Sequence, residues 1–280
     1  MNQGEALERI LRTAGEDFTD GIVTSGTTLT MVDSTIATKY NDNKFKGWVI
    51  FISISASGPQ NQYQVVSANT NSSGTVTWTT AMTSAPNAGD QYAICKPTIP
   101  IYTLIKFLND GLARFYYPDE DTSITTASQK LEYVLPVGVT GYTLRKVEIQ
   151  SIINITNVNY WYETSDWRVD PHIGGTQDTL VFTNQPTPLR TIKLTLAKPH
   201  PKLAVYSDAI SAYLDDDLVI TMGVERVMYW RKIKGKNKKN DVSNWMDAKS
   251  DYDNQVAANK VRLPQRGAKF LSLGNANVRR

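Results

Sequence analysis

The sequence predicts an α+β fold: a helical connector domain that carries an inserted small β-barrel and a second β region, and that ends in a basic C-terminal tail. Three observations support this fold class. Apolar residues recur at helical spacing in four segments, short β-branched or aromatic runs fill two other stretches, and cations concentrate near the C-terminus. A chain of 280 residues, of which 41% are hydrophobic, is long enough for one or two domains with a sizeable core.

The first predicted helix covers residues 3–14 and the second covers residues 101–116. In each, apolar side chains three and four positions apart form one stripe that can face a core. The first helix ends near Gly15, and the second stops before Pro118, because proline disfavours helical backbone in the preceding residue. The first stripe consists of Ala6, Leu7, Ile10, Leu11 and Ala14. The second consists of Leu104, Leu108, Leu112 and Phe115, with Ile105 beside them.

Residues 20–97 are predicted to form the inserted β-barrel-like module. Short strand-like runs alternate there with turns rich in Gly, Pro, Asn and Ser, which is typical of a small barrel or sandwich. The predicted strands are 21–23, 28–31, 48–53, 63–68, 75–79 and 91–95. The second β region follows the second helix, with strands at 131–135, 142–153, 159–163, 178–182 and 191–196.

The third predicted helix starts at Asp215-Asp216-Asp217 and runs to the vicinity of Lys232. Carboxylates at a helix start are favoured by the unpaired backbone N–H groups and by the positive end of the helix dipole. The fourth helix is predicted over residues 243–260, where Trp245, Ala248, Tyr252 and Val256 repeat at three- and four-residue intervals.

Because the β regions interrupt the helices, the sequence predicts one domain inserted into another. We assign residues 1–19 and 98–260 to the helical/β connector domain, 20–97 to the inserted module and 261–280 to an extended basic tail. The two ends of an inserted module must lie close in space when the helices on either side pack together.

The charge of the chain is unevenly distributed. Residues 1–230 contain 17 Lys and Arg against 23 Asp and Glu, whereas residues 231–280 contain 13 against 4. Such a basic end predicts contact with nucleic acid or with an acidic protein surface, although a merely solvated tail has the same composition. The run at 231–239 has no interleaved aromatic residues, so it suits phosphates rather than sequence-specific readout. The candidate portal- or DNA-contacting residues are Arg231, Lys232, Lys234, Lys236, Lys238, Lys239, Arg262, Arg266, Lys269, Arg279 and Arg280.

The composition disfavours several classes of protein. The longest apolar run, residues 48–52, is far shorter than the roughly 18 residues that cross a bilayer, so we expect no membrane-spanning segment. The first residues lack the apolar core of a secretory leader, which predicts synthesis without export. The single cysteine, Cys95, cannot form an intrachain disulfide or a multi-cysteine zinc site, and this fits a reducing cytosolic origin.

The sequence contains few residues suited to catalysis, and we expect no enzymatic activity, no cofactor and no metal. His172 and His200 each lie beside proline in predicted loops, and Asp170 with His172 falls short of the ligands of a metal site. Cys95 lies in an alternating strand and is expected to be a small core residue. The carboxylates at 119–121 are interpreted as a solvated turn. The sequence has neither a G-x-x-x-x-G-K-[ST] phosphate loop nor a G-x-S-x-G nucleophile motif.

One aromatic group, Tyr160-Trp161-Tyr162 with Trp167 nearby, admits two interpretations. Alternation along a strand places Tyr160 and Tyr162 on one face and Trp161 on the other. Such side chains serve as stacking platforms for sugars or bases, but they are more often core residues or subunit-interface anchors. We favour the core or interface interpretation.

Several features carry a resemblance to a known family. They are the helix Ala6–Ala14, the β module with Gly47–Ile52 and Ala85–Tyr92, the helix Tyr102–Tyr116, the strand pair Leu131–Pro136 and Leu144–Ile149, and the helix Leu214–Trp230. In this order, over nearly the whole chain, they resemble the head-to-tail adaptor (connector or neck) proteins of tailed bacteriophages. The long basic tail after Val261 is not a fixed feature of that family.

The resemblance implies a virion structural protein that forms a ring, commonly twelvefold, beneath the portal protein. The ring would join the portal to a tail or nozzle protein, with packaged DNA passing through its lumen and contacting it non-specifically. The implied location is the virion neck, after synthesis in the host cytoplasm. The expected interface carriers are the helix around Leu104–Phe115, the helix Leu218–Trp230 and the basic tail. The candidate subunit-interface residues are Leu104, Leu108, Leu112, Phe115, Trp245, Tyr252 and Val256.

Two other functions are alternatives. A glycan- or receptor-binding tail module would use the β regions, and it predicts exposed aromatic platforms and glycan affinity. A cell-wall hydrolase is disfavoured because the sequence shows no catalytic site. Glycan binding would identify the first alternative, and peptidoglycan turnover would identify the second.

Overall fold

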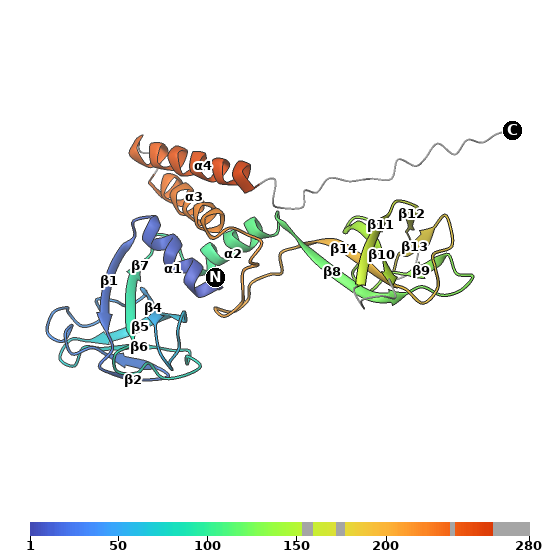
Figure 1. Ribbon diagram of the computed structural model, residues 1–280. Helices are drawn as coiled ribbons and strands as arrows, with labels where there is room; N and C mark the ends of the chain where they lie inside the picture. The colour runs from blue at the N-terminus through green and yellow to red at the C-terminus, as the bar shows by residue number, and fades with distance from the viewer. Residues whose placement is uncertain (153–158, 172–176, 236–238, 260–280) are drawn as a thin grey trace. The chain divides into compact units, whose positions relative to one another are not determined.

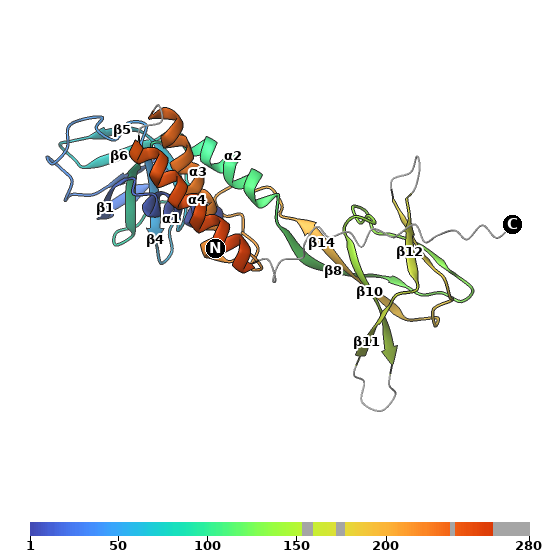
Figure 2. The same cartoon turned by 90° about the horizontal axis from the view of Figure 1, so that it is seen from above.

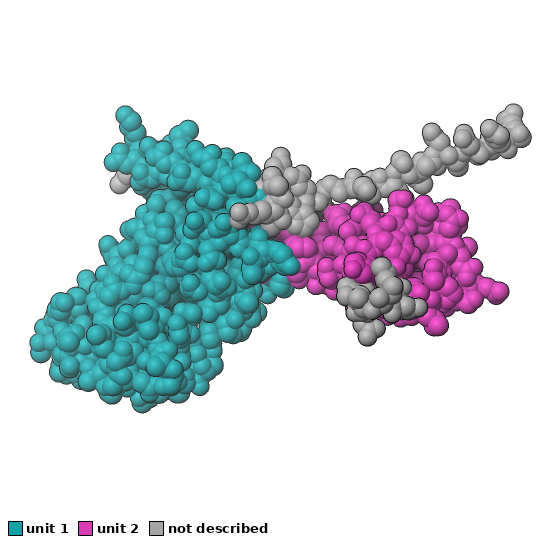
Figure 3. Space-filling view, viewed as in Figure 1, with its two compact units in different colours: residues 1–114, 201–259 teal, residues 115–200, 260–280 magenta. Residues whose placement is uncertain are grey.

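The computed structural model describes residues 1–152, 159–171, 177–235 and 239–259, which form two compact units (Figures 1 and 3). Unit 1 combines Met1–Arg114 with Pro201–Asn259, and the described residues of unit 2 lie within Phe115–His200. Each unit has a hydrophobic core of its own. Along the chain, unit 2 is therefore an insertion between two parts of unit 1.

The described part of unit 1 contains four helices, and α3 is the one on which the others converge. Both α1 and α2 pack against α3, and α3 packs against α4 (Figure 1). Glycines permit these close approaches: a Cβ at Gly223 would lie 2.3 Å from Ile10, and one at Gly111 would lie 2.3 Å from Met222. The bounds are α1 (Gln3–Thr13), α2 (Ile101–Leu112), α3 (Asp216–Lys234) and α4 (Lys239–Asn259).

These bounds confirm helices at the four predicted places and correct two ends. The fourth helix was predicted to begin at residue 243, but α4 begins at Lys239. The second helix was predicted to reach residue 116, but α2 ends at Leu112 and the chain is a strand from Tyr116 onward. The stripe Leu104, Leu108 and Leu112 is buried, as a core-facing stripe requires.

Between α1 and α2 the chain forms a seven-stranded antiparallel sheet in the order β1-β7-β4-β5-β6-β3-β2. The strand β4 is buried on both faces. Its Ile50 and Ile52 enter the core of the module, whereas the alternate residues Val49 and Phe51 are buried on the side that contacts α1. The strands are β1 (Asp17–Ile22), β2 (Ser25–Thr27), β3 (Thr30–Val32), β4 (Val49–Ile54), β5 (Tyr63–Thr70), β6 (Thr75–Trp78) and β7 (Gln91–Lys96).

Unit 2 is a β-sandwich. A four-stranded sheet, β11-β10-β14-β8, and a three-stranded sheet, β12-β13-β9, are both antiparallel and share one core. The strands β10 and β11 form a hairpin at one edge of the larger sheet (Figure 2). The strands are β8 (Tyr116–Thr125), β9 (Glu132–Val134), β10 (Leu144–Ile152), β11 (Asn159–Thr164), β12 (Trp167–Asp170), β13 (Thr179–Phe182) and β14 (Thr191–Pro199).

The larger sheet of unit 2 carries ion pairs on the face away from that core. Glu148 of β10 lies 2.8 Å from Lys146 Nζ and 2.9 Å from Lys193 Nζ of β14. Lys193 also lies 3.8 Å from Glu120 of β8. Lys198 of β14 alternates to the other face of the sheet, where it pairs with Asp119. The carboxylates at 119–121, which the sequence suggested were a solvated turn, therefore belong to a strand and are partly paired across it.

The predicted fold class is wrong. The described chain is mostly β, with fourteen strands in three antiparallel sheets and four helices, so it is not a helical connector domain with a β insert. The term α+β fits only loosely. Residues 115–200, which we had assigned to the connector domain, build a separate β core because their apolar strand faces pack on one another.

The division into units also differs from the assigned domain boundaries. The strands of residues 20–97 belong to the same unit as α1, α2, α3 and α4, and the units meet along the chain at 114/115 and 200/201. Independent folding of residues 20–97 stays a prediction.

Candidate interaction surface on the α3–α4 hairpin

The helices α3 and α4 lie side by side and are joined by residues 235–238, so they form a helical hairpin (Figures 1 and 2). The N-cap residue of α3 is Asp215, whose carboxylate accepts a hydrogen bond of 2.9 Å from the N–H of Asp217. The last turn of α3 contains Arg231, Lys232 and Lys234. Carboxylates at the start and cations at the end both complement the helix dipole, so the predicted acidic helix start is confirmed.

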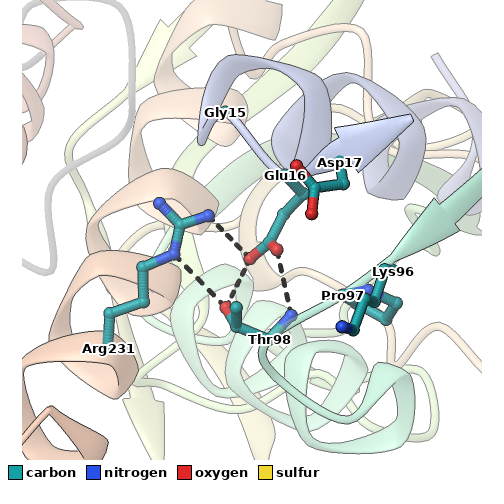
Figure 4. Close-up of a pocket in the computed structure, with 7 residues that line it drawn as sticks. All are labelled: Gly15, Glu16, Asp17, Lys96, Pro97, Thr98 and Arg231. Atoms are coloured by element: carbon teal, nitrogen blue, oxygen red, sulfur yellow. Dashed lines mark hydrogen bonds and ion pairs between the residues drawn. The ribbon is translucent and has the colours of Figure 1, made fainter.

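Arg231 lies in a small hollow of unit 1 and holds a buried carboxylate (Figure 4). Its Nη2 is 2.9 Å from Oε1 of Glu16, whose side chain is only 2% exposed, and its Nη1 donates to the carbonyl of Ala14 (2.8 Å). The N–H of Thr98 donates to the same carboxylate (3.0 Å). Arg231 thereby ties the end of α3 to the two segments that flank the β module.

The hollow around Arg231 is too small for most ligands. Its volume is about 220 Å³, below the ~300 Å³ at which small-molecule pockets begin. A second, open hollow of about 450 Å³ is lined by Arg9 and Arg12 of α1 together with residues of α3 and α4. Arg9 pairs there with Asp216 (3.1 Å), and Arg12 pairs with Glu8 (3.0 Å). Arg9, Arg12 and Arg231 are therefore each engaged by a carboxylate of the chain itself.

Lys232 and Trp245 join the two helices of the hairpin. The Nζ of Lys232 lies 3.6 Å from the centroid of the Trp245 ring, and the ring of Tyr229 lies 5.8 Å from it. The indole N–H of Trp245 donates to Oε1 of Glu225 (2.8 Å), a residue that is 6% exposed. A cation–π contact and a hydrogen bond to a buried carboxylate therefore hold α4 on α3.

The structure gives internal contacts to three of the predicted portal- or DNA-contacting cations. Besides Arg231 and Lys232, the Nζ of Lys234 lies 5.0 Å from the centroid of the Trp230 ring, although its residue is exposed. Lys239 is exposed at the start of α4. The other predicted contact residues lie outside the described residues: Lys236, Lys238, Arg262, Arg266, Lys269, Arg279 and Arg280.

The predicted subunit-interface residues fall into two groups. Leu104, Leu108 and Leu112 are at most 1% exposed inside unit 1, so they have no area left for a partner. Phe115 is half-buried as the first residue of unit 2. The three residues on α4 are half-buried and share the stripe of buried Ala248, which packs on α3: Trp245, Tyr252 and Val256.

The outer face of α4 is exposed. In this helix of 21 residues, only Ala248 and Asn259 are buried. Met246 of α4 is 60% exposed and is followed in sequence by exposed Asp247, and Ile233 at the end of α3 is 52% exposed. Sequence reasoning missed Ile233 and Met246. Their signal is an apolar residue that falls outside the core-facing stripe of its helix.

In unit 2, Tyr160, Trp161 and Tyr162 alternate as predicted but are not core residues. Tyr160 and Tyr162 lie on one face of β11 and are 51% and 45% exposed. Trp161 lies on the opposite face, where the Nζ of Lys193 is 5.1 Å from its ring centroid. Trp167 packs against the core of unit 2, and its indole N–H donates to the carbonyl of Thr164 (2.9 Å).

The remaining candidate residues have structural surroundings. Cys95 is fully buried in β7, and burial raises the pKa of its thiol, so the predicted core role is confirmed. His200 is 6% exposed, and its ring lies 6.4 Å from that of Tyr117. His172 lies outside the described residues.

The described residues bring together no group of three or more His, Cys, Asp or Glu side chains that could hold a metal ion. Within the same ranges, no helix is both long enough and apolar enough to cross a membrane. In comparisons with known proteins, no family model, no curated protein and no solved structure matches this chain.

Proposed function

We propose that this chain is a virion structural protein, a head-to-tail adaptor that assembles into a ring between the portal and the tail of a tailed bacteriophage. The observation that carries the proposal is the free outer face of α4. The helix is 21 residues long, its outer face has no partner among the described residues, and it lies between two basic parts of the sequence. A free helical face next to concentrated charge is suited to assembly with other chains.

The order of elements along the chain also supports the proposal, because it resembles the order in phage head-to-tail adaptors. In this proposal the chain acts by assembly, without enzymatic activity and without a cofactor. Its ring, commonly twelvefold in that family, docks on the portal on one side and on a tail or nozzle protein on the other. Basic residues of the C-terminal region meet an acidic portal surface or the phosphates of DNA in the lumen.

Electron microscopy of the purified chain, alone and mixed with portal protein, tests this function. We expect closed rings with a central channel, and a complex in which the ring is coaxial with the portal. A chain that stays monomeric at micromolar concentration, both alone and with portal protein, would contradict the proposal.

One observation favours a second candidate, a glycan- or receptor-binding tail module. Tyr160 and Tyr162 present two exposed rings on one strand face, which is the arrangement of a stacking platform. A glycan array tests it, with Tyr160→Ala/Tyr162→Ala as the variant. Tyr142→Ala is the matched control, because Tyr142 is a 73% exposed tyrosine of the same unit. Binding that survives the double variant would exclude this platform.

A further inference from the structure

The connection between β3 and β4 presents lysines beside aromatic rings. The Nζ of Lys44 lies 5.7 Å from the centroid of the Trp48 ring, and the Nζ of Lys96, at the end of β7, lies 5.9 Å from the same centroid. In the same connection, the Nζ of Lys39 lies 5.4 Å from the centroid of the Tyr40 ring. All three lysines are exposed.

A row of three aromatic rings joins these lysines. The ring centroids of Tyr40 and Phe45 are 4.9 Å apart, and those of Phe45 and Trp48 are 5.2 Å apart. Phe45 belongs to the core of the β module, against which Tyr40 and Trp48 pack partly buried. The rings therefore anchor the charged side chains at one place on the module. The name lysine patch denotes Lys39, Lys44 and Lys96.

The connection that carries the patch is long but firmly held. Residues 33–48 contain no helix or strand, and connections longer than about 12–15 residues are usually either functional or disordered. Here the buried side chain of Asn69 accepts from the N–H of Phe45 (2.8 Å) and donates to the carbonyl of Asn41 (3.1 Å). The N–H of Asn43 donates to the carbonyl of Asn69 (2.9 Å). These bonds favour a functional role for the length of the connection.

The lysine patch keeps its positive charge. Among the described residues, none of its three members forms an ion pair with a carboxylate. Asp17 lies opposite Lys96 on β1 without pairing with it. Asp42 in the connection accepts a hydrogen bond from the N–H of Asn71 (2.6 Å), and exposed Lys46 adds a further cation to the same segment.

We propose that the lysine patch binds the sugar–phosphate backbone of duplex DNA. A duplex presents one negative charge for about every 1.7 Å of its axis, so Lys44 and Lys96, which share one ring, both meet phosphates. Exposed Asn41 and Asn43 supply amide groups beside them, and such groups also bond phosphate oxygens. This contact is separate from the C-terminal cations and needs no ring, so it goes beyond the proposed function.

The surroundings of the patch favour duplex DNA over two other partners. None of the exposed large apolar side chains lies within residues 33–48, so the surface lacks the apolar centre of a protein interface, where lysine is also depleted. Tyr40 and Trp48 pack against the module core, so they do not form an open stacking platform for the bases of a single strand.

Three double variants of the full chain test the patch. Lys44→Gln/Lys96→Gln removes the two charges that share Trp48, and Lys44→Arg/Lys96→Arg keeps them. Lys106→Gln/Lys202→Gln is the matched control, because these two exposed lysines belong to the same unit and its net charge falls equally. All four positions are exposed, so folding is retained and is checked by circular dichroism.

Fluorescence anisotropy with a labelled duplex, between about 50 and 200 mM salt, gives the result. We expect Lys44→Gln/Lys96→Gln to bind about tenfold more weakly and its slope of log affinity against log salt to be shallower by about 1.8, at about 0.9 for each lost contact. The control and the arginine variant should bind as wild type does.

Several outcomes would overturn the inference. Equal losses in the glutamine variant and its control would show that only net charge acts, and a wild type that does not bind the duplex would remove the contact altogether. Tighter binding of a single strand of the same length, or equal competition by polyglutamate, would exclude duplex DNA as the partner. Electron microscopy of the same wild-type sample reports the ring separately, so the ring and the DNA contact stand or fall independently.

Discussion

At the scale of single residues, Arg231 belongs to a basic run of the sequence but forms an internal ion pair with Glu16. We expect Arg231→Met to lower the free energy of unfolding of unit 1 by about 3 kcal/mol, because removing one partner of a buried ion pair leaves the other charge uncompensated. The Glu16 carboxylate would keep only its hydrogen bonds from Thr98. Urea unfolding measures the loss, and Lys234→Met is the exposed control. If Arg231→Met leaves the midpoint of urea unfolding unchanged but weakens DNA binding, Arg231 makes a nucleic-acid contact instead.

Glu148 gives unit 2 a pH-dependent stability. Burial by itself would raise the pKa of this carboxyl, but hydrogen bonds from Lys146 and Lys193 outweigh burial and lower that pKa. The unfolded chain therefore binds the proton at a higher pH than the folded chain does. The stabilisation is present above the ordinary Glu pKa of about 4.3 and is lost as pH falls through that value toward the lowered pKa.

The measurement is thermal unfolding of wild type and Glu148→Gln between pH 6 and pH 3, about the range that spans these values. We expect the variant to be less stable at pH 6 and the difference to shrink as the pH falls. Glu163→Gln, whose side chain is 61% exposed, is the control and should behave as wild type. A constant difference across the range would contradict the assignment.

At the scale of elements, Trp245 determines how firmly α4 is attached. We expect Trp245→Ala to weaken the docking of α4 by about 2 kcal/mol, because it removes a half-buried aromatic ring together with the hydrogen bond to buried Glu225. Amide exchange in α4 should then accelerate about 30-fold, the equivalent of that energy. Trp245→Phe should lose roughly half as much, and Asn244→Ala on the exposed side should change nothing. Equal exchange in all variants would show that Trp245 does not anchor the helix.

The β module of residues 20–97 is bound closely to α1. The Tyr63 hydroxyl donates to Gln3 Oε1 (3.0 Å), and a Cβ at Gly4 would lie 1.7 Å from the carbonyl of Asn61. We expect replacement of residues 20–97 by a Gly/Ser linker to reduce helical circular dichroism and to abolish cooperative unfolding, because α1 loses the surface on which it packs. Retention of a cooperative helical unit would establish the separable module that the sequence predicts.

At the scale of the whole molecule, the C-terminal region carries a large share of the positive charge. Truncation after Lys260 removes five cations and no carboxylate. If these cations bind DNA phosphates, the slope of log affinity against log salt should become shallower by about 0.9 for each lost contact. Portal attachment of the truncated chain at low and high salt is the second measurement. Wild-type behaviour in both assays would identify the region as a solvated appendage.

Much of the secondary structure was predictable from local pattern. The stripe of α1, the acidic start of α3 and the alternation of Tyr160, Trp161 and Tyr162 each depend on neighbours within a few residues. The end of α2 and the strand β8 were not predictable in this way. Strand β8 contains Pro118 and three carboxylates, and it pairs with β14, whose residues lie up to 83 positions away in the sequence.

By itself, the sequence determined where the four helices and most of the strands form, that Cys95 is buried, and that positive charge gathers after residue 230, because periodicity and composition are local properties. Only the tertiary structure decided that residues 115–200 form a separate β-sandwich, that Arg231 holds Glu16, and that Ile233 and Met246 remain exposed. Those facts depend on which distant faces pack together. A charge or an apolar side chain has the same identity in the sequence whether it is bound internally or left free for a partner, and packing alone separates the two cases.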